Sequence, residues 1–314
     1  MQDLAVVHIH VHHTLGFSSE FVEWVKNVAE LCEIPYDVTI HDYFLACPRI
    51  TMIDGSGQYC NNYRLEKCES CIQTLGSPAG RVSVWYWRAS HEKFLADARR
   101  IFVPNESVQR HMAQFFPSLE FSTREHPETP AERIFAPVVR QPGELLRVAV
   151  IGAIGPHKGS KVLQQCAQDA VERRLPIEFH VFGYSDIAQL RAFPNVKLTG
   201  QYMERELPRL LALEKCHLAF FPAVWPETYS YTLSQAWFAG LYPVGFDLGA
   251  IADRIRRNAW GHLLPLEIAS DPSSLNDTLL ALRPSPQPPD FDPVMGSRLY
   301  PAIWHDYYGL PERV

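Results

Sequence analysis

Several features that define other classes of protein are missing from this chain. No apolar run approaches the roughly 20 residues that a helix needs to span a bilayer, and the N-terminus lacks the basic and apolar regions of a signal peptide. Basic residues are not in excess: the net charge of −6 argues against a general nucleic-acid binder, which needs a basic face. No repeat of solenoid length is present. These absences lead us to expect a globular protein in the cytoplasm.

Cysteine is scarce and odd in number, with 7 in 314 residues, which fits a reducing compartment better than a disulfide framework. Four of them, Cys47, Cys60, Cys68 and Cys71, lie in a loop-rich insert between residues 43 and 78. Four thiolates suit a tetrahedral structural zinc, although the spacing is not that of a standard zinc ribbon. Unpaired small apolar side chains, or a disulfide, are the alternatives.

The second half of the chain alternates short apolar runs with amphipathic stretches. Strands are predicted at 147–151, 177–182, 196–198, 217–221 and 242–245. Helices are predicted at 158–173, 186–192, 204–214, 228–238 and 250–258. This alternation indicates βαβ units, a parallel sheet and, with right-handed crossovers, a doubly wound domain.

The first half is also α/β but less regular. Strands are predicted at 5–10, 36–40 and 100–104, and helices at 18–32, 81–98 and 105–115, the last with Asn105 as its N-cap. The proline-rich stretch 116–142 predicts a linker and one irregular strand. We therefore expect an incomplete N-terminal domain over residues 1–142, which carries the insert 43–78, and a C-terminal domain over residues 143–314.

The segment from Pro226 to Ala236 lies where a predicted strand gives way to a predicted helix. In an open α/β sheet, ligands bind at the carboxyl ends of the strands. The start of a helix also attracts anions, because its first N–H groups lack intrahelical partners. This junction is therefore expected to hold a phosphorylated ligand, with Glu227 beside it.

A second strand-to-helix junction, Gly152 to Gly159, contains three glycines and Lys158. Glycine allows a ligand to approach the backbone closely, and Lys158 could neutralise a diphosphate. Taken alone, such a turn often carries glycine for steric reasons only. Together with the segment 226–236, it favours phosphate binding.

These two junctions together resemble the family 4 glycosyltransferases, which are retaining enzymes of the GT-B fold that use nucleotide sugars. The stretches 38–43, 102–105, 182–184 and 198–200 resemble further motifs of that family in the same order. The resemblance covers roughly residues 5 to 264. It implies a GT-B-like α/β chain of two Rossmann-like domains facing a cleft, the first of them abbreviated.

The resemblance also implies roles for individual residues. Glu227 matches an acid that contacts the donor sugar, Lys158 a basic residue that stabilises the leaving diphosphate, and His41 a histidine near the sugar. These three are the expected catalytic residues. Donor-binding residues are expected at Gly152, Gly155, Gly183, Tyr184, Thr228, Tyr229, Ser230 and Gln235. On the acceptor side the candidates are His12 and His13.

The activity that the resemblance implies is hexosyl transfer from a UDP- or GDP-sugar to a saccharide or lipid-linked acceptor, in surface polysaccharide synthesis. A lysine and a helix start can stabilise the leaving group without a metal, so no cofactor is expected for catalysis. A structural zinc and peripheral association with the inner face of a membrane stay open.

Departures from the family pattern leave open weaker donor binding, a different preferred nucleotide or a loss of activity. Gln235 replaces a second acid, Ala153 replaces a basic residue, and the strand and glycine-rich turn that open the family's first domain are absent. The alternative is a catalytically inactive scaffold that binds a nucleotide or sugar. We also expect the chain to be a piece of a longer polypeptide with further domains. The stretch 299–308 resembles the family's closing C-terminal helix.

Overall fold

The structure is a computed structural model that describes residues 6–18, 20–128, 135–287 and 291. The chain forms two compact units: unit 1 comprises Met1–His126 and Trp225–Tyr229, and unit 2 comprises Pro127–Val224 and Ser230–Val314. The sequence placed a single boundary at 142/143. The part of the predicted linker after His126 groups with unit 2, where for example Phe135 N–H donates to Phe238 O over 2.8 Å.

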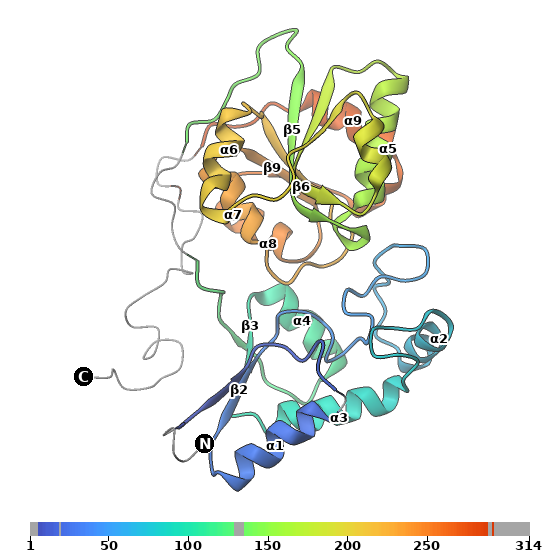
Figure 1. Ribbon diagram of the computed structural model, residues 1–314, viewed down its shortest axis with the longest axis vertical. Helices are drawn as coiled ribbons and strands as arrows, with labels where there is room; N and C mark the ends of the chain where they lie inside the picture. Colours follow the sequence, from blue (N-terminus) through green and yellow to red (C-terminus); the bar gives the residue numbers. More distant parts are fainter. Residues whose placement is uncertain (1–5, 19, 129–134, 288–290, 292–314) are drawn as a thin grey trace, which may run out of the picture. The chain divides into compact units, whose positions relative to one another are not determined.

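Unit 1 is built on a parallel sheet in the order β1-β2-β3-β4 (Figure 1). Its strands are β1 (Ile9–Val11), β2 (Tyr36–Thr39), β3 (Arg100–Val103) and β4 (Ser122–Thr123). Its helices are α1 (Phe21–Leu31), α2 (Leu65–Leu75), α3 (Val84–Ala96) and α4 (Glu106–Phe115). Asn105 caps α4 as predicted, since its side chain accepts from Val108 N–H.

The insert 43–78 is more ordered than its composition indicated, because it contains α2. Arg88 of α3 donates to two of its carbonyl oxygens, Ala46 O at 2.9 Å and Tyr63 O at 3.1 Å. The Tyr63 hydroxyl also lies 2.5 Å from His111 Nδ1 on α4. These long-range contacts hold the insert against α3 and α4. The periodicity of the sequence could not predict them.

Unit 2 is built on a parallel sheet in the order β10-β9-β8-β5-β6-β7. Its strands are β5 (Leu146–Ile154), β6 (Ile177–Ser185), β7 (Val196–Leu198), β8 (Leu218–Phe221), β9 (Tyr242–Phe246) and β10 (His262–Leu264). Its α-helices are α5 (Ser160–Glu172), α6 (Leu207–Leu213), α7 (Tyr231–Phe238), α8 (Gly249–Asn258) and α9 (Pro272–Ala281). The helices α5 and α9 pack together on one side of the sheet, and α6, α7 and α8 lie on the other (Figure 1).

The strand order of unit 2 reverses between β5 and β8, as expected for a doubly wound domain. The chain leaves β5 toward β6 on one side and arrives at β8 on the other. The loops that follow β5 and β8 therefore separate, and the carboxyl ends of these strands form the topological switch point at which ligands bind in such sheets.

Three elements at this switch point differ from the expected bounds. β5 and β6 run on through Gly152 and Gly183 to Ile154 and Ser185, because the two backbones keep pairing past the glycines. A 3-10 turn, Pro156–Lys158, precedes α5. The helix α7 begins at Tyr231 instead of residue 228.

No helix in the described part of the chain is both long and apolar enough to cross a bilayer. The predicted closing helix at 299–308 lies outside the described residues.

Candidate functional site

The loops after β5 and β8 pack against each other at the switch point of unit 2. Gly159, which precedes α5, has a φ of +78°, and a Cβ placed on it would lie 1.9 Å from Pro222 O. Val224 N–H also donates to His157 O over 3.0 Å. Only glycine fits at 159, so its presence fixes how the two loops meet.

At the adjoining ends of β5 and β6, two glycines bring the backbones of the strands close together. Gly152 and Gly183 are paired across the two strands with φ of +120° and +132°, and a Cβ on Gly183 would lie 2.1 Å from Gly152 O. The next pair is Ala153 with Tyr184, whose side chain is 50% exposed. The two backbones therefore approach too closely for a side chain at Gly183, and of these four residues Tyr184 alone carries a large side chain.

The helix α7 begins beside this edge. Its N-cap is Ser230, whose side chain makes no capping hydrogen bond, and a Cβ placed on Gly152 would lie 3.9 Å from Thr232 Cγ2. The first N–H groups of a helix have no intrahelical partners, and the macrodipole is positive there. With Lys158 in the neighbouring turn, this end of unit 2 has the chemistry to bind an anion.

The expected donor-binding residues are divided between the two units. Six of them and the catalytic candidate Lys158 lie in unit 2 at or near the carboxyl ends of its strands: Gly152, Gly155, Gly183, Tyr184, Ser230 and Gln235. Gln235 is half-buried on the second turn of α7. The remaining candidates, His12, His13, His41, Glu227, Thr228 and Tyr229, belong to unit 1.

Within unit 1, the segment Trp225–Tyr229 is tied to the carboxyl ends of β2 and β3. The Thr228 hydroxyl donates to His41 O over 2.5 Å, and Asn105 Nδ2 donates to Thr228 O over 2.5 Å. Glu227 is only 4% exposed. These bonds bring Glu227 and His41 into the same part of unit 1 and occupy the Thr228 groups that would otherwise extend α7.

His41 belongs to a row of aromatic rings in unit 1. Its Nε2 lies 3.0 Å from His12 Nδ1, and its ring stacks on His126 with centroids 4.4 Å apart. Burial, with smaller effects of His12 and His13, lowers the pKa of His41 to about 4. His41 is therefore neutral at pH 7 and can exchange hydrogen bonds with a ligand without bringing a charge.

The cysteines of the insert are all free thiols. Cys68 Sγ accepts from Arg88 NH2 at 3.1 Å, and burial raises the pKa of the Cys47 thiol to about 11. In the described ranges, no group of three or more His, Cys, Asp or Glu residues is arranged to hold a metal ion. The structural zinc therefore stays a prediction, which metal analysis with and without a chelator can test.

Sequence reasoning missed several residues around the candidate site. His126 stacks on His41 but lies in a proline-rich stretch that was interpreted as a linker. Asn105 donates to Thr228 O but was assigned only as a helix cap. Arg254 of α8 lies buried behind the start of α7. Nothing in the sequence distinguishes Arg254 from the exposed Arg256 and Arg257 on the same helix.

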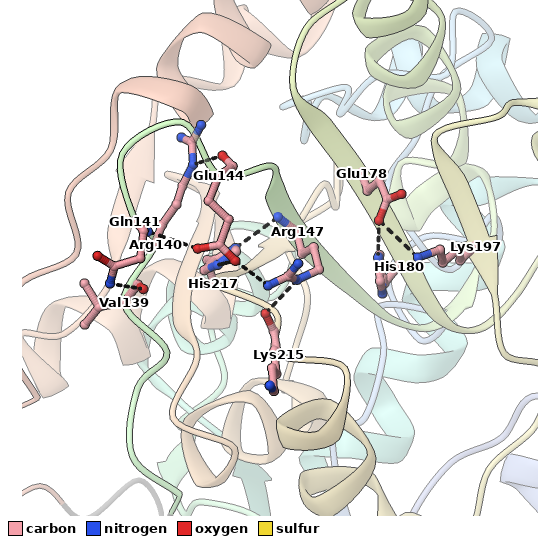
Figure 2. Close-up of polar contacts among 10 residues, drawn as sticks. All are labelled: Val139, Arg140, Gln141, Glu144, Arg147, Glu178, His180, Lys197, Lys215 and His217. Carbon is pink, nitrogen blue, oxygen red and sulfur yellow. Dashed lines mark hydrogen bonds and ion pairs between the residues drawn. The ribbon is translucent and has the colours of Figure 1, made fainter.

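The opposite, amino edge of the unit 2 sheet is occupied by paired side chains (Figure 2). Arg147 of β5 donates to Glu144 Oε1 at 2.7 Å and to Lys215 O at 3.0 Å, while its N–H donates to His217 Nδ1. On β6, Glu178 contacts both His180 and Lys197. Most of the polar side chains at this edge thus bond to one another or to the backbone.

Comparisons with known proteins give a family match within unit 2 and a set of similar folds. Residues 146–283, most of the described part of unit 2, match the family model described as "Glycosyl transferases group 1". No curated protein sequence matches the chain. Solved structures match over nearly the whole chain. Sucrose-phosphate synthase from Thermosynechococcus elongatus has 14% identity and a TM-score of 0.59, covering 93% of this chain and 66% of its own.

Two further structures support the same fold. A trehalose-phosphate synthase from Burkholderia vietnamiensis has 9% identity and a TM-score of 0.59, covering 90% of this chain and 66% of its own. Anabaena HepE in complex with UDP and glucose has 12% identity and a TM-score of 0.55, with 88% and 68% covered. The chain spans about two thirds of the length of these proteins. Its fold is that of the GT-B glycosyltransferases, an α/β fold with parallel sheets.

Proposed function

We propose that this chain is a glycosyltransferase that moves a sugar from a nucleotide-sugar donor to an acceptor hydroxyl. One observation carries the proposal: the glycine-rich turn with Lys158 and the start of α7 lie together at the β5/β8 switch point, inside the region that matches a glycosyltransferase family. A doubly wound sheet binds its ligand there.

The chemistry of sugar transfer fits these groups. The bond between the anomeric carbon and the β-phosphate oxygen breaks, and the nucleoside diphosphate leaves with the electron pair. The acceptor oxygen bonds to the anomeric carbon, and its proton passes to the departing phosphate or to water. Lys158 and the α7 amides would stabilise the negative charge that develops on the diphosphate, because they are fixed before the reaction begins.

For the candidate residues of unit 1, we propose contacts with the sugar. We assign Glu227 to the donor sugar's hydroxyls and His41 to a neutral hydrogen bond with the sugar, which its lowered pKa supports. His12 lies within hydrogen-bond distance of His41 and is the better placed of the two acceptor-side histidines to influence it. Retention of configuration, a UDP or GDP donor, and a saccharide or lipid-linked acceptor in surface polysaccharide synthesis are parts of the same proposal.

The second candidate is a catalytically inactive module that binds a nucleotide or sugar. Gln235 on α7 and Ala153 at the end of β5 favour it, since each lacks the charge of the residue it replaces. Glutamine can still donate and accept hydrogen bonds with a ribose diol, but without the strength that a carboxylate adds.

Calorimetry with UDP and GDP, followed by measurement of UDP release from UDP-glucose, tests the proposal. We expect the wild type to bind UDP, and Lys158→Ala to weaken that binding about 10- to 100-fold through loss of one charged contact. The exposed Lys161→Ala, three residues on, is the matched control and should change it less than about twofold. No binding of either nucleotide by the wild type would overturn the proposal.

The isosteric Glu227→Gln separates the two candidates. For a transferase we expect UDP release to fall by about 100-fold or more, with UDP affinity and thermal stability kept, because the side chain keeps its volume. Binding of UDP by the wild type without measurable turnover, in the presence or absence of added saccharides, favours the inactive module instead.

A further inference from the structure

A buried arginine in unit 2 lies directly behind the start of α7. Arg254 of α8 is 2% exposed. Its NH1 donates to Ser230 O at 2.6 Å, and its NH2 donates to Ser234 Oγ at 2.6 Å and Glu128 Oε1 at 3.1 Å. The guanidinium carbon also lies 5.5 Å from the centre of the buried Trp237 ring. The Arg254 side chain thus donates hydrogen bonds to a backbone carbonyl, a hydroxyl and a carboxylate.

Stability alone is a weak reason for this arrangement. Both side chains of the Glu128–Arg254 pair are 3% exposed. Removing two charges from water offsets much of their attraction, so apolar residues of similar volume often stabilise a core equally well. What an apolar core cannot do is fix the direction of a backbone carbonyl.

Arg254 fixes such a carbonyl at the N-cap of α7. The Ser230 C=O and the Tyr231 N–H belong to one planar trans peptide, so they point in opposite directions. Because the carbonyl is held by Arg254 from behind and by Leu233 N–H within the first turn, the direction of the amide that opens α7 is set as well. The carbonyl cannot rotate without breaking a charged hydrogen bond.

Arg254 also controls how α7 is turned about its axis. Ser230 and Ser234 are four residues apart, so they lie on the same face of the helix one turn from each other. Ser234 Oγ accepts from Arg254 and donates to Glu128 Oε1 at 2.8 Å. These two contacts, to Ser230 and Ser234, fix the position of α7 along its axis and its rotation about that axis relative to α8.

We propose that Arg254, with Glu128 as its charge partner, is a positioning residue that holds the first turn of α7 in the orientation needed to bind the donor's diphosphate. This inference rests on the proposed function. It assigns Arg254 no contact with the substrate. Its effect passes through the Ser230 peptide, and it should therefore alter binding of the second phosphate more than binding of the nucleoside.

The test compares the affinities for UDP and UMP by calorimetry, with thermal unfolding measured in parallel. The ratio of the two affinities reports the contribution of the second phosphate and is insensitive to a uniform loss of folded protein. In Arg254→Lys, one ammonium group cannot make the three contacts of the guanidinium. We expect the UDP/UMP ratio to fall at least fivefold, with UMP affinity within twofold of the wild type.

Two variants separate positioning from a general structural role. Glu128→Gln removes the ion pair but keeps an acceptor oxygen, so it should lower thermal stability while changing the ratio less than twofold. Arg256→Gln, on the same helix, removes exposed ion pairs to Asp247 and Asp253 and should change neither quantity. Ser234→Ala, which deletes one hydroxyl, is the milder variant if Arg254→Lys does not fold, and should lower the ratio two- to threefold.

The outcomes distinguish this inference from the proposed function. If the wild type binds no UDP, both are overturned. If it binds UDP but Arg254→Lys and Ser234→Ala leave the UDP/UMP ratio unchanged, the positioning role alone is overturned. An equal loss in Arg254→Lys and Glu128→Gln, in proportion to their thermal stabilities, would also overturn it, because that result belongs to a purely structural ion pair.

Discussion

The two edges of the unit 2 sheet satisfy their polar groups in different ways. At the amino edge, Arg147, Glu144 and His217 bond to one another and to the backbone (Figure 2). At the carboxyl edge, glycines keep side chains away from the strand ends, and α7 begins without a side-chain cap. The polar side chains at the amino edge bond mainly to one another, whereas the carboxyl edge is built from glycine backbone and an α7 N-terminus that has no side-chain cap.

The largest expected difference between the edges is the loss in free energy of unfolding when a glycine is replaced by alanine. Gly159 and Gly143, which precedes β5, share a φ of +78°, but a Cβ on Gly143 has nothing within 4 Å, whereas one on Gly159 would overlap Pro222 O. We expect Gly159→Ala to lower the free energy of unfolding by about 4 kcal/mol, from backbone strain and overlap together.

Gly143→Ala is the matched control and should lower the free energy by only about 1–2 kcal/mol, from backbone strain alone. Urea unfolding measures both variants against the wild type. Similar losses at the two positions would mean that crowding at the switch point does not limit residue 159.

A smaller effect is expected from breaking the amino edge. Arg147→Met removes the ion pair with Glu144 and the bond to Lys215 O, and should lower the free energy of unfolding by about 1–2 kcal/mol. UDP affinity, measured by calorimetry, should stay within twofold, because this edge lies at the other end of the strands. Arg191→Met, at an exposed position in unit 2, is the control for removing a surface arginine. A tenfold loss of UDP affinity in Arg147→Met would contradict the separation of the two edges.

The smallest effect is a dependence on pH at the amino edge. Burial, then the charge of Arg147, lowers the pKa of His217, while Glu144 opposes the shift. The unfolded chain therefore binds a proton near pH 6.5 that the folded chain takes up only at lower pH, so stability falls as the pH drops below 6.5. His217→Asn keeps an acceptor for Arg147 N–H but does not titrate.

Between pH 7 and 5.5, the wild type should accordingly lose up to roughly 1 kcal/mol more than His217→Asn, as measured by urea unfolding at each pH. The buried histidines of unit 1, such as His41, act in the same direction in both proteins and cancel in the difference. Equal pH dependence in the two proteins would remove His217 as the cause.

The sequence predicted the parallel arrangement and the two loops of the candidate site, because apolar runs and glycines mark them locally. It did not predict that β5 and β6 continue to Ile154 and Ser185, since backbone pairing beyond Gly152 leaves no side-chain pattern. The sequence also did not predict the later start of α7 or the burial of Arg254. Both depend on residues far away in the chain, among them His41 and Glu128.

The grouping of Trp225–Tyr229 with unit 1 has a consequence for how the protein is made. Tyr43 packs edge-on against Trp225 with ring centroids 6.3 Å apart, and His41 and Asn105 bond to Thr228. A nascent chain that has emerged from the ribosome only as far as His126 lacks Trp225 and Thr228, the partners of these three residues. The N-terminal half must therefore wait for roughly a hundred further residues to be translated before its own packing is complete.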